Sequence, residues 1–127
     1  MEKIENIISY DIRGAIFNVY NNLGPGLLES VYETALAYEL EKIGRKVKKQ
    51  VAIPVIYNEE RIDLGFRLDL LVDNLVIVEI KSVEALAPVH HKQLLTYLRL
   101  TGLKLGILVN FNSDDLEKNI VRIVNHL

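Results

Sequence analysis

The stretch from Leu75 to Lys81, LVIVEIK, is apolar until its end, where Glu79 and Lys81 interrupt it. A short run of this kind is typical of a strand that is buried on both faces of a sheet. Because successive side chains of a strand point to opposite faces, Glu79 and Lys81 share one face with Ile77. An unpaired charge in such a strand would be costly. The two charged residues therefore mark a candidate site at the end of a central strand.

Two alternating segments precede this strand and predict two further strands. The first alternates from Val47 to Val55, and Pro54 favours a position at the edge of the sheet. A polar turn at 58–60 follows. Apolar residues then recur at every second position: Ile62, Leu64, Phe66, Leu68 and Leu70. Asp69 lies in this second segment and is the third charged residue of the candidate site.

The loop between these strands determines which sheet face Asp69 occupies. A two-residue loop at Asp73-Asn74 would turn Asp69 to the opposite face from Glu79. A three-residue loop, Val72-Asp73-Asn74, would pair Asp69 with Ile77 and leave Glu79 as its diagonal neighbour. Asn74 is the last residue of the second loop and favours it, because Asn tolerates the left-handed conformation that this position needs. We predict this loop, with both carboxylates on one face.

Apolar residues recur at steps of three and four in the first part of the chain, which predicts a helix with one buried stripe. Its apolar positions are Ile4, Ile8, Ile12, Ala15, Ile16, Val19 and Leu23. Gly24-Pro25-Gly26 then breaks the chain, and a second helix is expected to run to about Ile43. The apolar residues of this second helix cover more than one stripe, so we expect it to pack on two sides.

The last third of the chain predicts a helix and two strands. Pro88 precedes a helix that is expected near Val89 to Leu100 and is closed by Gly102. The segment 103–111 then predicts a buried strand, and Ile120 to Val124 predicts a last short strand. The order of elements is therefore helix, helix, strands, helix, strand, strand.

The chain has 127 residues, half of them apolar and a quarter charged, with seven Gly and three Pro. This composition predicts one folded domain over residues 1–127 and excludes disordered, collagen-like and low-complexity chains. The chain has no Cys, which excludes a disulfide scaffold, a thiolate zinc site and a cysteine nucleophile. It also lacks a signal-peptide pattern and any run of about 20 apolar residues. We therefore expect a soluble, cytoplasmic protein.

The formal net charge is -2, with 15 Lys and Arg against 17 Asp and Glu. No overall positive field therefore indicates nucleic acid as a partner, and any such function must depend on a local site. Basic residues that could contact phosphates gather after the second helix and in the expected hairpin: Arg45, Lys46, Lys48, Lys49, Arg61 and Arg67. A solvated face explains this cluster equally well.

Asp69 and Glu79, together with the backbone carbonyl of Ile80, would form a hard-oxygen site suited to Mg2+ or Mn2+. Lys81 could orient or activate a metal-bound water, which would make the group a hydrolytic site for phosphodiesters. The alternative is a buried ion pair between Lys81 and a carboxylate, without metal. The spacing of the residues leaves both interpretations open.

The same residues belong to a longer set of motifs. The segment from Gly26 to Tyr32, GLLESVY, has the pattern G-x-x-E-x-x-Y, and Asp69, Glu79-Ile80-Lys81 and Gln93-x-x-x-Tyr97 follow it. In this combination the chain resembles the GxxExxY family of the PD-(D/E)xK nuclease-like superfamily, over nearly its whole length. The resemblance implies an α/β (α+β) fold with a restriction-endonuclease-like core, in which helices flank a central mixed sheet. It also implies Asp69 and Glu79 as metal ligands and Lys81 as the catalytic lysine.

The resemblance implies roles for five further residues. Glu29, counted with the catalytic residues, would approach the metal site from the second helix and orient a ligand water or contribute to a second cation. A carboxylate in a first helical turn is also stabilised by the helix dipole without any function. Tyr32 would support Glu29. Gln93 and Tyr97 stack on one helix face and would contact the carboxylates or the nucleic-acid backbone, the alternative being a plain helix surface. His90 would act as a proton carrier, a phosphate contact or a helix cap, and we favour a contact.

Two functions follow from these observations. The first is a metal-dependent nuclease that cleaves phosphodiesters in DNA, with RNA as the alternative substrate. The second is a nucleic-acid-binding or protein-binding module that keeps the fold and hydrolyses nothing, which the near-neutral charge favours. A small-molecule hydrolase lacks support, because the chain has no Gly-rich phosphate loop, nucleophile elbow or Ser-His-Asp arrangement. A homodimer is a further expectation, since the apolar edge strands of two copies could pair.

Overall fold

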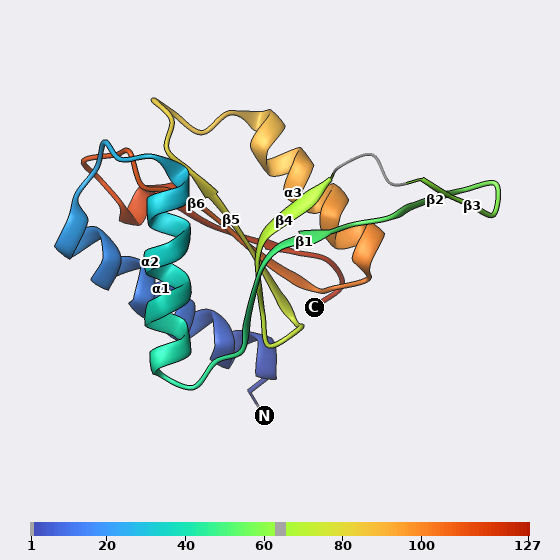
Figure 1. The fold of residues 1–127 in the computed structure, drawn as a ribbon, viewed down its shortest axis with the longest axis horizontal. Helices are drawn as coiled ribbons and strands as arrows, with labels where there is room; N and C mark the ends of the chain where they lie inside the picture. Colours follow the sequence, from blue (N-terminus) through green and yellow to red (C-terminus); the bar gives the residue numbers. More distant parts are fainter. Residues whose placement is uncertain (1, 63–65) are drawn as a thin grey trace.

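A five-stranded mixed sheet separates the helices into two layers (Figure 1). The computed structural model describes residues 2–62 and 66–127. In this part of the chain the helices are α1 (Ile4–Leu23), α2 (Glu29–Lys42), α3 (Pro88–Thr101) and a short 3-10 helix, η1 (Glu117–Asn119). The strands are β1 (Val47–Ala52), β2 (Val55–Tyr57), β3 (Glu60–Ile62), β4 (Arg67–Val72), β5 (Val76–Lys81), β6 (Leu105–Asn110) and β7 (Ile120–Val124).

The large sheet has the strand order β1-β4-β5-β6-β7. Strands β5 and β6 are parallel and are connected through α3, whereas the other neighbouring pairs are antiparallel. Strands β4 and β5 are central and β1 is at an edge, as the sequence predicts. The expected α+β class, with a mixed sheet between helices, is confirmed.

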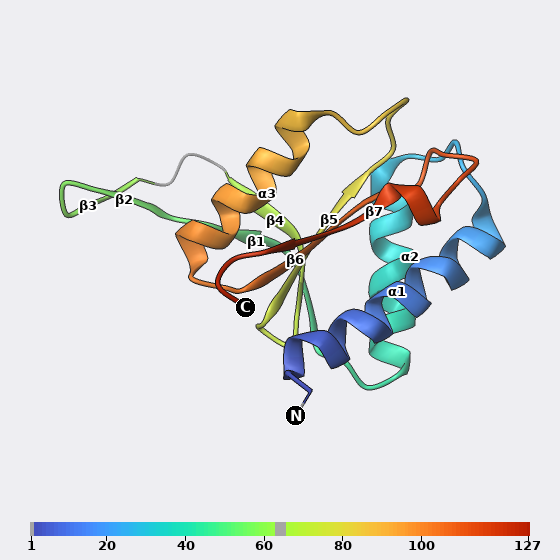
Figure 2. The ribbon, with the colours of Figure 1, turned by 180° about the vertical axis from the view of Figure 1, so that it is seen from behind.

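Strand β5 sends alternate side chains into two separate cores. Val76, Val78 and Ile80 pack with α1 and α2, whereas Ile77 packs with residues of α3. Figures 1 and 2 show the two layers, with α1 and α2 on one side of the sheet and α3 on the other. Glu79 has the same parity as Ile77, so the backbone turns it toward the side of α3.

Gly106 in β6 allows α3 to lie close to the sheet. A Cβ atom at this position would lie 2.8 Å from Cδ1 of Leu94 in α3, which is far inside normal contact distance. Leu94 is fully buried and has little room to move away. The missing side chain therefore sets the distance between the sheet and the helix that carries Gln93 and Tyr97.

The helices lie where the sequence predicts them, with one difference in packing. Helix α1 has the predicted bounds, and α2 and α3 differ from the expectation only at their ends. The expectation that α2 packs on two sides is wrong. Only one stripe of α2 meets the core, and Val31 and Tyr38 remain exposed, because a single face of this helix turns toward α1 and the sheet. None of the helices in the described residues combines the length and apolarity needed to cross a membrane.

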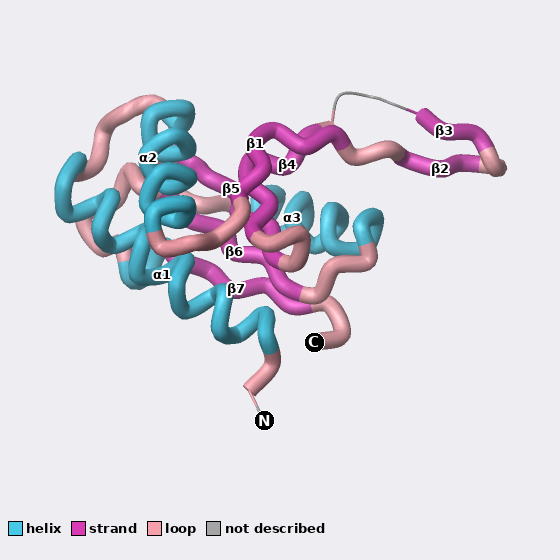
Figure 3. The backbone as a smooth tube through the Cα atoms, turned by 60° about the horizontal axis from the view of Figure 1, so that its bottom comes forward, coloured by secondary structure: helices cyan, strands magenta, loops and turns pink. Residues whose placement is uncertain are grey.

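Strands β2 and β3 form a two-stranded arm that projects away from the large sheet (Figure 3). The sequence predicts one strand from Val47 to Val55, but β1 ends at Ala52 and β2 begins only after Pro54, because Pro offers no N–H to a ladder. In the second predicted segment, β3 ends at Ile62 and β4 begins at Arg67, and Phe66 belongs to neither strand. Leu64, one of its apolar positions, lies outside the described residues.

The hairpin between β4 and β5 has a three-residue loop, but one residue later than predicted. Leu70 pairs with Val78 and Val72 pairs with Val76, so the loop is Asp73–Leu75. This register brings Asp69 opposite Glu79 and corrects the predicted pairing with Ile77. The physical reason is that both Asp73 and Asn74 adopt left-handed conformations, with φ of 52° and 57°, so neither ends a strand. The residue opposite Asp69 changes by two positions, from Ile77 to Glu79, so the predicted face of Asp69 is unchanged.

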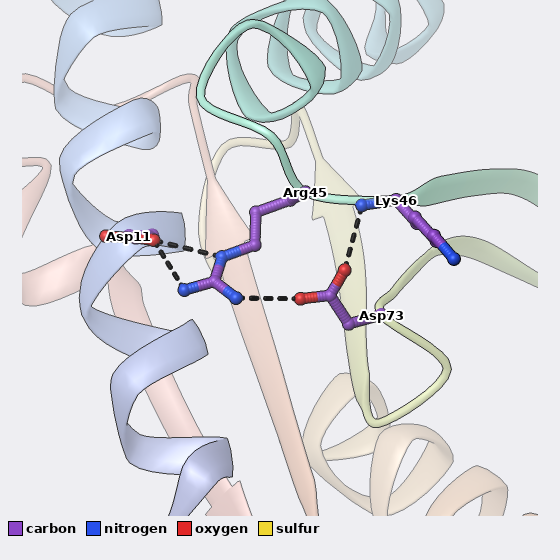
Figure 4. Close-up of polar contacts among 4 residues, drawn as sticks. All are labelled: Asp11, Arg45, Lys46 and Asp73. Atoms are coloured by element: carbon purple, nitrogen blue, oxygen red, sulfur yellow. Dashed lines mark hydrogen bonds and ion pairs between the residues drawn. The ribbon is translucent and has the colours of Figure 1, made fainter.

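Asp73 is held in this loop by Arg45 and Lys46 (Figure 4). Arg45 donates to Oδ2 of Asp73 over 2.9 Å, and its Nε and Nη2 donate to Oδ2 of Asp11 over 3.0 and 2.8 Å. The backbone N–H of Lys46 donates to Oδ1 of Asp73 over 2.8 Å. Arg45 thus connects α1, the start of β1 and the hairpin loop. Its guanidinium is engaged in the fold, whereas the sequence grouped Arg45 with basic residues that could form either a phosphate-contacting or a solvated face.

Candidate metal centre

Asp69 lies at the point where β4 and β5 cease to pair. Beyond the pair of Leu70 and Val78, the carboxylate of Asp69 takes the place of a backbone partner, and the N–H of Ile80 donates to its Oδ2 over 2.8 Å. The N–H and C=O of one strand residue point to the same side. The carbonyl oxygen of Ile80 therefore faces the same gap between the strands as Asp69.

Glu79 is a buried carboxyl group beside Asp69. The residue is 4% exposed, and its Oε1 atom is buried without a hydrogen-bond partner among the described residues. Burial raises the pKa of Glu79 to about 9, with further increases from the charge of Asp69 and from a hydrogen bond between the two side chains, while Lys81 lowers it. In the absence of metal, the carboxyl group of Glu79 is therefore protonated at neutral pH.

Lys81 is half-buried at the end of β5, on the same face as Glu79. Its backbone carbonyl accepts a hydrogen bond from the N–H of Phe111 over 3.0 Å, which fixes the end of the strand against the chain after β6. Its ammonium group acts on Glu79 through electrostatic attraction. Across the described residues, Lys81 forms no direct ion pair with Glu79 or Asp69.

Glu29 lies in the first turn of α2 and is bonded to the residue that follows Lys81. Its Oε2 accepts the N–H of Ser82 over 3.0 Å, and the hydroxyl of Ser82 donates to the carbonyl of Leu27 over 2.6 Å. Glu29 is exposed and borders a shallow pocket lined by Leu27, Ser82 and their neighbours. These contacts bring the N-terminal end of α2 to the end of β5 (Figure 1).

Tyr32 holds the loop before α2 in place. Its hydroxyl donates to the carbonyl of Gly24 over 2.6 Å and accepts the N–H of Leu27 over 3.1 Å. Its ring is stacked on Phe111, with 4.4 Å between the ring centroids. The two defining side chains of the G-x-x-E-x-x-Y segment therefore both bind backbone groups around the site, and Tyr32 supports the position of Glu29 indirectly.

The three residues expected from α3 occupy different environments. Tyr97 is buried, and its pKa is raised first by burial and then by the negative charges of Glu79 and Asp69, so its hydroxyl lies within their electrostatic range. Gln93, one turn earlier, is exposed to solvent. His90 caps the helix, because its Nδ1 accepts the N–H of Ala87 over 3.0 Å.

The structure adds Glu33 and Gln50, which the sequence analysis missed. The side-chain amide of Gln50 in β1 donates to Oε2 of Glu33 over 2.9 Å and to Oδ1 of Asp69 over 3.4 Å. Glu33 follows Glu29 by one helical turn, and this i, i+4 spacing was a usable signal that both face the same way. No pattern in the sequence indicates Gln50.

Asn110 is a further residue beside the candidate site that the sequence analysis missed. This residue is fully buried at the end of β6, where it lies beside Lys81 in the parallel ladder. Its side chain accepts the N–H of Val83 and donates to the carbonyl of the same residue, each over 3.0 Å. A polar residue at the end of an apolar strand was the available signal. Asn110 fixes the direction in which the chain leaves the candidate site.

The oxygen atoms of this site fit a hard divalent cation. In the described residues, no group of three or more His, Cys, Asp or Glu side chains is arranged to hold a metal ion. The donors would instead be two carboxylates, Asp69 and Glu79, and the carbonyl of Ile80. Mg2+ commonly binds through one or two carboxylates and keeps several waters, so this set suits it. The partnerless Oε1 of Glu79 is an oxygen atom that a cation would satisfy.

The family model described as the PD-(D/E)XK nuclease superfamily matches residues 6–123. The chain belongs to this superfamily. Searches of curated proteins and of solved structures gave no match. Membership in the PD-(D/E)XK superfamily agrees with the restriction-endonuclease-like arrangement of sheet and helices. It indicates a nuclease-type function and nucleic-acid binding in general, in a superfamily whose nucleases typically depend on a divalent metal.

Proposed function

We propose that this chain is a single PD-(D/E)XK nuclease-like domain that hydrolyses phosphodiester bonds in DNA, with Mg2+ or Mn2+ as its cofactor. In this proposal Asp69, Glu79 and the carbonyl of Ile80 hold the metal. The observation that carries it is the buried Oε1 of Glu79, which has no partner in the described chain and lies beside a second carboxyl group. Burying such a group is costly, and a cation would offset the cost.

A bound Mg2+ would polarise a phosphoryl oxygen and stabilise the charge that develops in the transition state. Lys81 would orient the attacking water and add positive charge at the same place. The attacking water would release a proton to solvent as its oxygen forms the new bond to phosphorus. The bond to the departing sugar oxygen would break, and that oxygen would take up a proton from solvent. Tyr97 and the exposed Gln93 would contact the substrate backbone next to the carboxylates, with His90 at the start of the same helix.

Basic residues on the strands beside Asp69 support binding to phosphates. Lys49 is exposed in β1 and lowers the pKa of Glu33, which places its charge near the carboxylates. Arg67 is exposed at the start of β4, and its guanidinium lies 3.5 Å from the carbonyl of Gln50.

Four further proposals belong to this assignment. We propose that the substrate is DNA rather than RNA and that the chain belongs to the GxxExxY family. We also propose that the protein is cytoplasmic and forms a homodimer.

Calorimetric titration with Mn2+ tests the metal centre without a substrate. We expect one site in the wild-type protein and its loss in both Asp69→Ala and Glu79→Ala. Glu84→Gln is the matched control, because Glu84 is exposed in the loop after β5 and its loss should leave the titration unchanged. A titration without binding, or binding that survives both substitutions, would reject the metal centre.

Hydrolysis of DNA in Mn2+ then tests the role of Lys81. We expect Lys81→Ala to bind Mn2+ like the wild-type protein and to lose hydrolysis. Unchanged hydrolysis would remove Lys81 from the catalytic group. RNA of the same sequence, assayed in parallel, tests the preference for DNA.

One observation favours a second function, a binding module that hydrolyses nothing. Glu29 and Tyr32 are both bonded to backbone groups, which gives these motif residues a role in holding the loops. A gel shift that is sensitive to salt, needs no metal and survives Glu79→Ala would support this function over the nuclease.

A further inference from the structure

Glu33 of α2 is connected to Asp69 of β4 through a single side chain. The amide nitrogen of Gln50 lies 2.9 Å from Oε2 of Glu33 and 3.4 Å from Oδ1 of Asp69. Carboxylate oxygens only accept hydrogen bonds, so both must face the NH2 group of the amide. The two carboxylates therefore fix the orientation of Gln50, which in turn contacts the oxygen of Asp69 that Ile80 leaves free.

Gln50 adopts an unusual backbone conformation that serves this contact. Its φ is 52°, in the left-handed region, although it lies inside β1. Its neighbours Lys49 and Val51 pair with Leu70 and Leu68, so Gln50 stands opposite Asp69. A non-Gly residue in this region carries strain, and such strain gathers at functional sites.

The charges around Gln50 explain why a neutral donor occupies this place. The pKa of Glu33 is raised first by burial and also by the negative charges of Asp69 and Glu29, whereas its hydrogen bond to Gln50 lowers it. Without the amide, two partly buried carboxylates would face each other and repel. The NH2 group satisfies an oxygen of each and keeps both carboxylates in place.

We propose that Gln50 is a positioning residue that orients the carboxylate of Asp69 for the metal, and that Glu33 acts through Gln50 by anchoring its amide. This inference rests on the proposed metal centre. Hydrogen bonds of this kind to a metal-ligating carboxylate fix its orientation, and removing one typically weakens metal binding about 10- to 100-fold. Glu33 contributes an acceptor oxygen here, and its charge is secondary.

Two substitutions at Glu33 separate anchoring from charge. Glu33→Ala removes the acceptor, whereas Glu33→Gln keeps an oxygen that can accept from Gln50 and removes the charge. We expect Mn2+ binding, measured by calorimetry, to weaken about tenfold in Glu33→Ala and less than about threefold in Glu33→Gln. Glu41→Ala, at an exposed site in the same helix, is the control and should not change the affinity.

A substitution at Gln50 tests the amide itself. Gln50→Asn keeps a residue that tolerates the left-handed backbone, but its amide is one methylene too short to bridge both carboxylates. We expect Mn2+ binding to weaken about tenfold, and the double variant with Glu33→Ala to be no weaker than the more affected single variant, because both act through one contact. Additive losses would overturn the connection between Glu33 and Gln50.

A spectroscopic measurement follows the contact in metal-free protein. The side-chain NH2 signals of Gln50 in a proton–nitrogen spectrum should shift in Glu33→Ala and stay near their wild-type positions in Glu33→Gln. Signals that do not move in Glu33→Ala would overturn the inference.

The outcomes distinguish this inference from the proposed function. If the wild-type protein binds Mn2+, Asp69→Ala abolishes binding, and Glu33→Ala and Gln50→Asn both bind like the wild type, only the positioning role is overturned. If the wild-type protein binds no Mn2+, the proposed metal centre is rejected and the positioning role with it. Circular dichroism of each variant confirms that it is folded before titration.

Discussion

Glu79 carries its carboxyl group into the core on the strand that also supplies Lys81. The protein accommodates this group at neutral pH by keeping it protonated, since its pKa is raised to about 9 by burial and by Asp69. A bound cation would reverse this state, because positive charge favours the ionised carboxylate. The same side chain therefore has a stability cost in metal-free protein and would have a use in the proposed metal-bound form.

The stability of metal-free protein should fall as the pH rises from about 4.5 to about 9, the usual and the raised pKa of Glu79. Within this window the folded protein holds a proton that the unfolded chain releases, so raising the pH favours unfolding. Glu79→Gln removes this titration and should stabilise the protein at about pH 8 by up to about 5 kcal/mol, because each of the roughly 3.5 pH units above 4.5 is worth about 1.4 kcal/mol. Urea unfolding with a chelator, at several pH values, measures the effect. Parallel pH profiles of the two proteins would contradict it.

Tyr32 is the residue that joins the loop before α2 to the core. Tyr32→Phe keeps the ring on Phe111 but leaves the carbonyl of Gly24 and the N–H of Leu27 without a partner. We expect a loss of about 1–2 kcal/mol in the free energy of unfolding, measured by urea denaturation. Tyr38→Phe, on the 64% exposed side chain in the same helix, is the control and should change stability by less than about 0.5 kcal/mol. Equal losses of stability in Tyr32→Phe and Tyr38→Phe would show that the hydroxyl of Tyr32 does not stabilise the loop.

Residue types and spacing were enough to predict that three charged side chains of β4 and β5 lie near one another. Asp69, Glu79 and Lys81 stand out because each is charged in an apolar strand, and period-two alternation places them on one face. Their exact neighbours were harder to predict, since the loop depends on the left-handed conformations of Asp73 and Asn74 together. Gln50 could not be predicted at all, because its role depends on a backbone angle that is uncommon for its residue type.

Arg45 connects α1 to the hairpin that carries both carboxylates and so helps to fix the position of this hairpin. One guanidinium binds a carboxylate on α1 and another in the hairpin loop, at the junction between α2 and β1. All three side chains are partly shielded from solvent. Charge-assisted hydrogen bonds of this kind are stronger than those between neutral groups.

Arg45→Met should therefore destabilise the protein more than the same change at Arg13. Arg45 loses hydrogen bonds to Asp11 and Asp73, and the expected cost is about 1–2 kcal/mol after allowance for their remaining solvent exposure. Arg13 makes a 3.5 Å contact to the exposed Glu117 and lies 5.1 Å from the ring centroid of Phe17, both at the surface, so Arg13→Met should cost less than about 1 kcal/mol. Urea unfolding of both variants measures the difference. Equal costs would contradict the role of Arg45.

Elements with a clear hydrophobic period were predicted well, and those without one were not. Helix α1 and strands β5, β6 and β7 follow their patterns. The arm of β2 and β3 shows the same alternation as a core strand, so the sequence alone suggested longer strands in its place. Two features separate the arm from the sheet. Pro54 is visible in the sequence, whereas the position of the chain in the folded protein is not.

The protein as a whole combines a rigid sheet with an exposed arm. Strands β5 and β6 are buried along nearly their whole length, whereas Ile56 and Tyr57 of the arm are 64% and 66% exposed. An isolated two-stranded hairpin is marginally stable in water. Stability should therefore differ strongly between these two parts.

Hydrogen exchange measured by mass spectrometry should show this difference. We expect amides of β5 and β6 to exchange only through global unfolding and those of β2 and β3 to exchange fastest among the strands. The edge strand β7 serves as the internal reference, with intermediate exchange. Arm amides protected as strongly as those of β6 would contradict the expectation and indicate that another chain covers the arm.

The β4–β5 hairpin has a consequence for thermodynamic linkage. Asp69 and Glu79 stand on the two sides of one short hairpin, so they stay near each other even after the chain unfolds, at a high effective concentration. If the proposed metal centre holds Mg2+, the unfolded chain will then retain some affinity for the ion. Ligand-induced stabilisation depends on the difference in affinity between the two states, so Mg2+ bound at that centre would raise the melting temperature by less than its affinity for the folded protein implies.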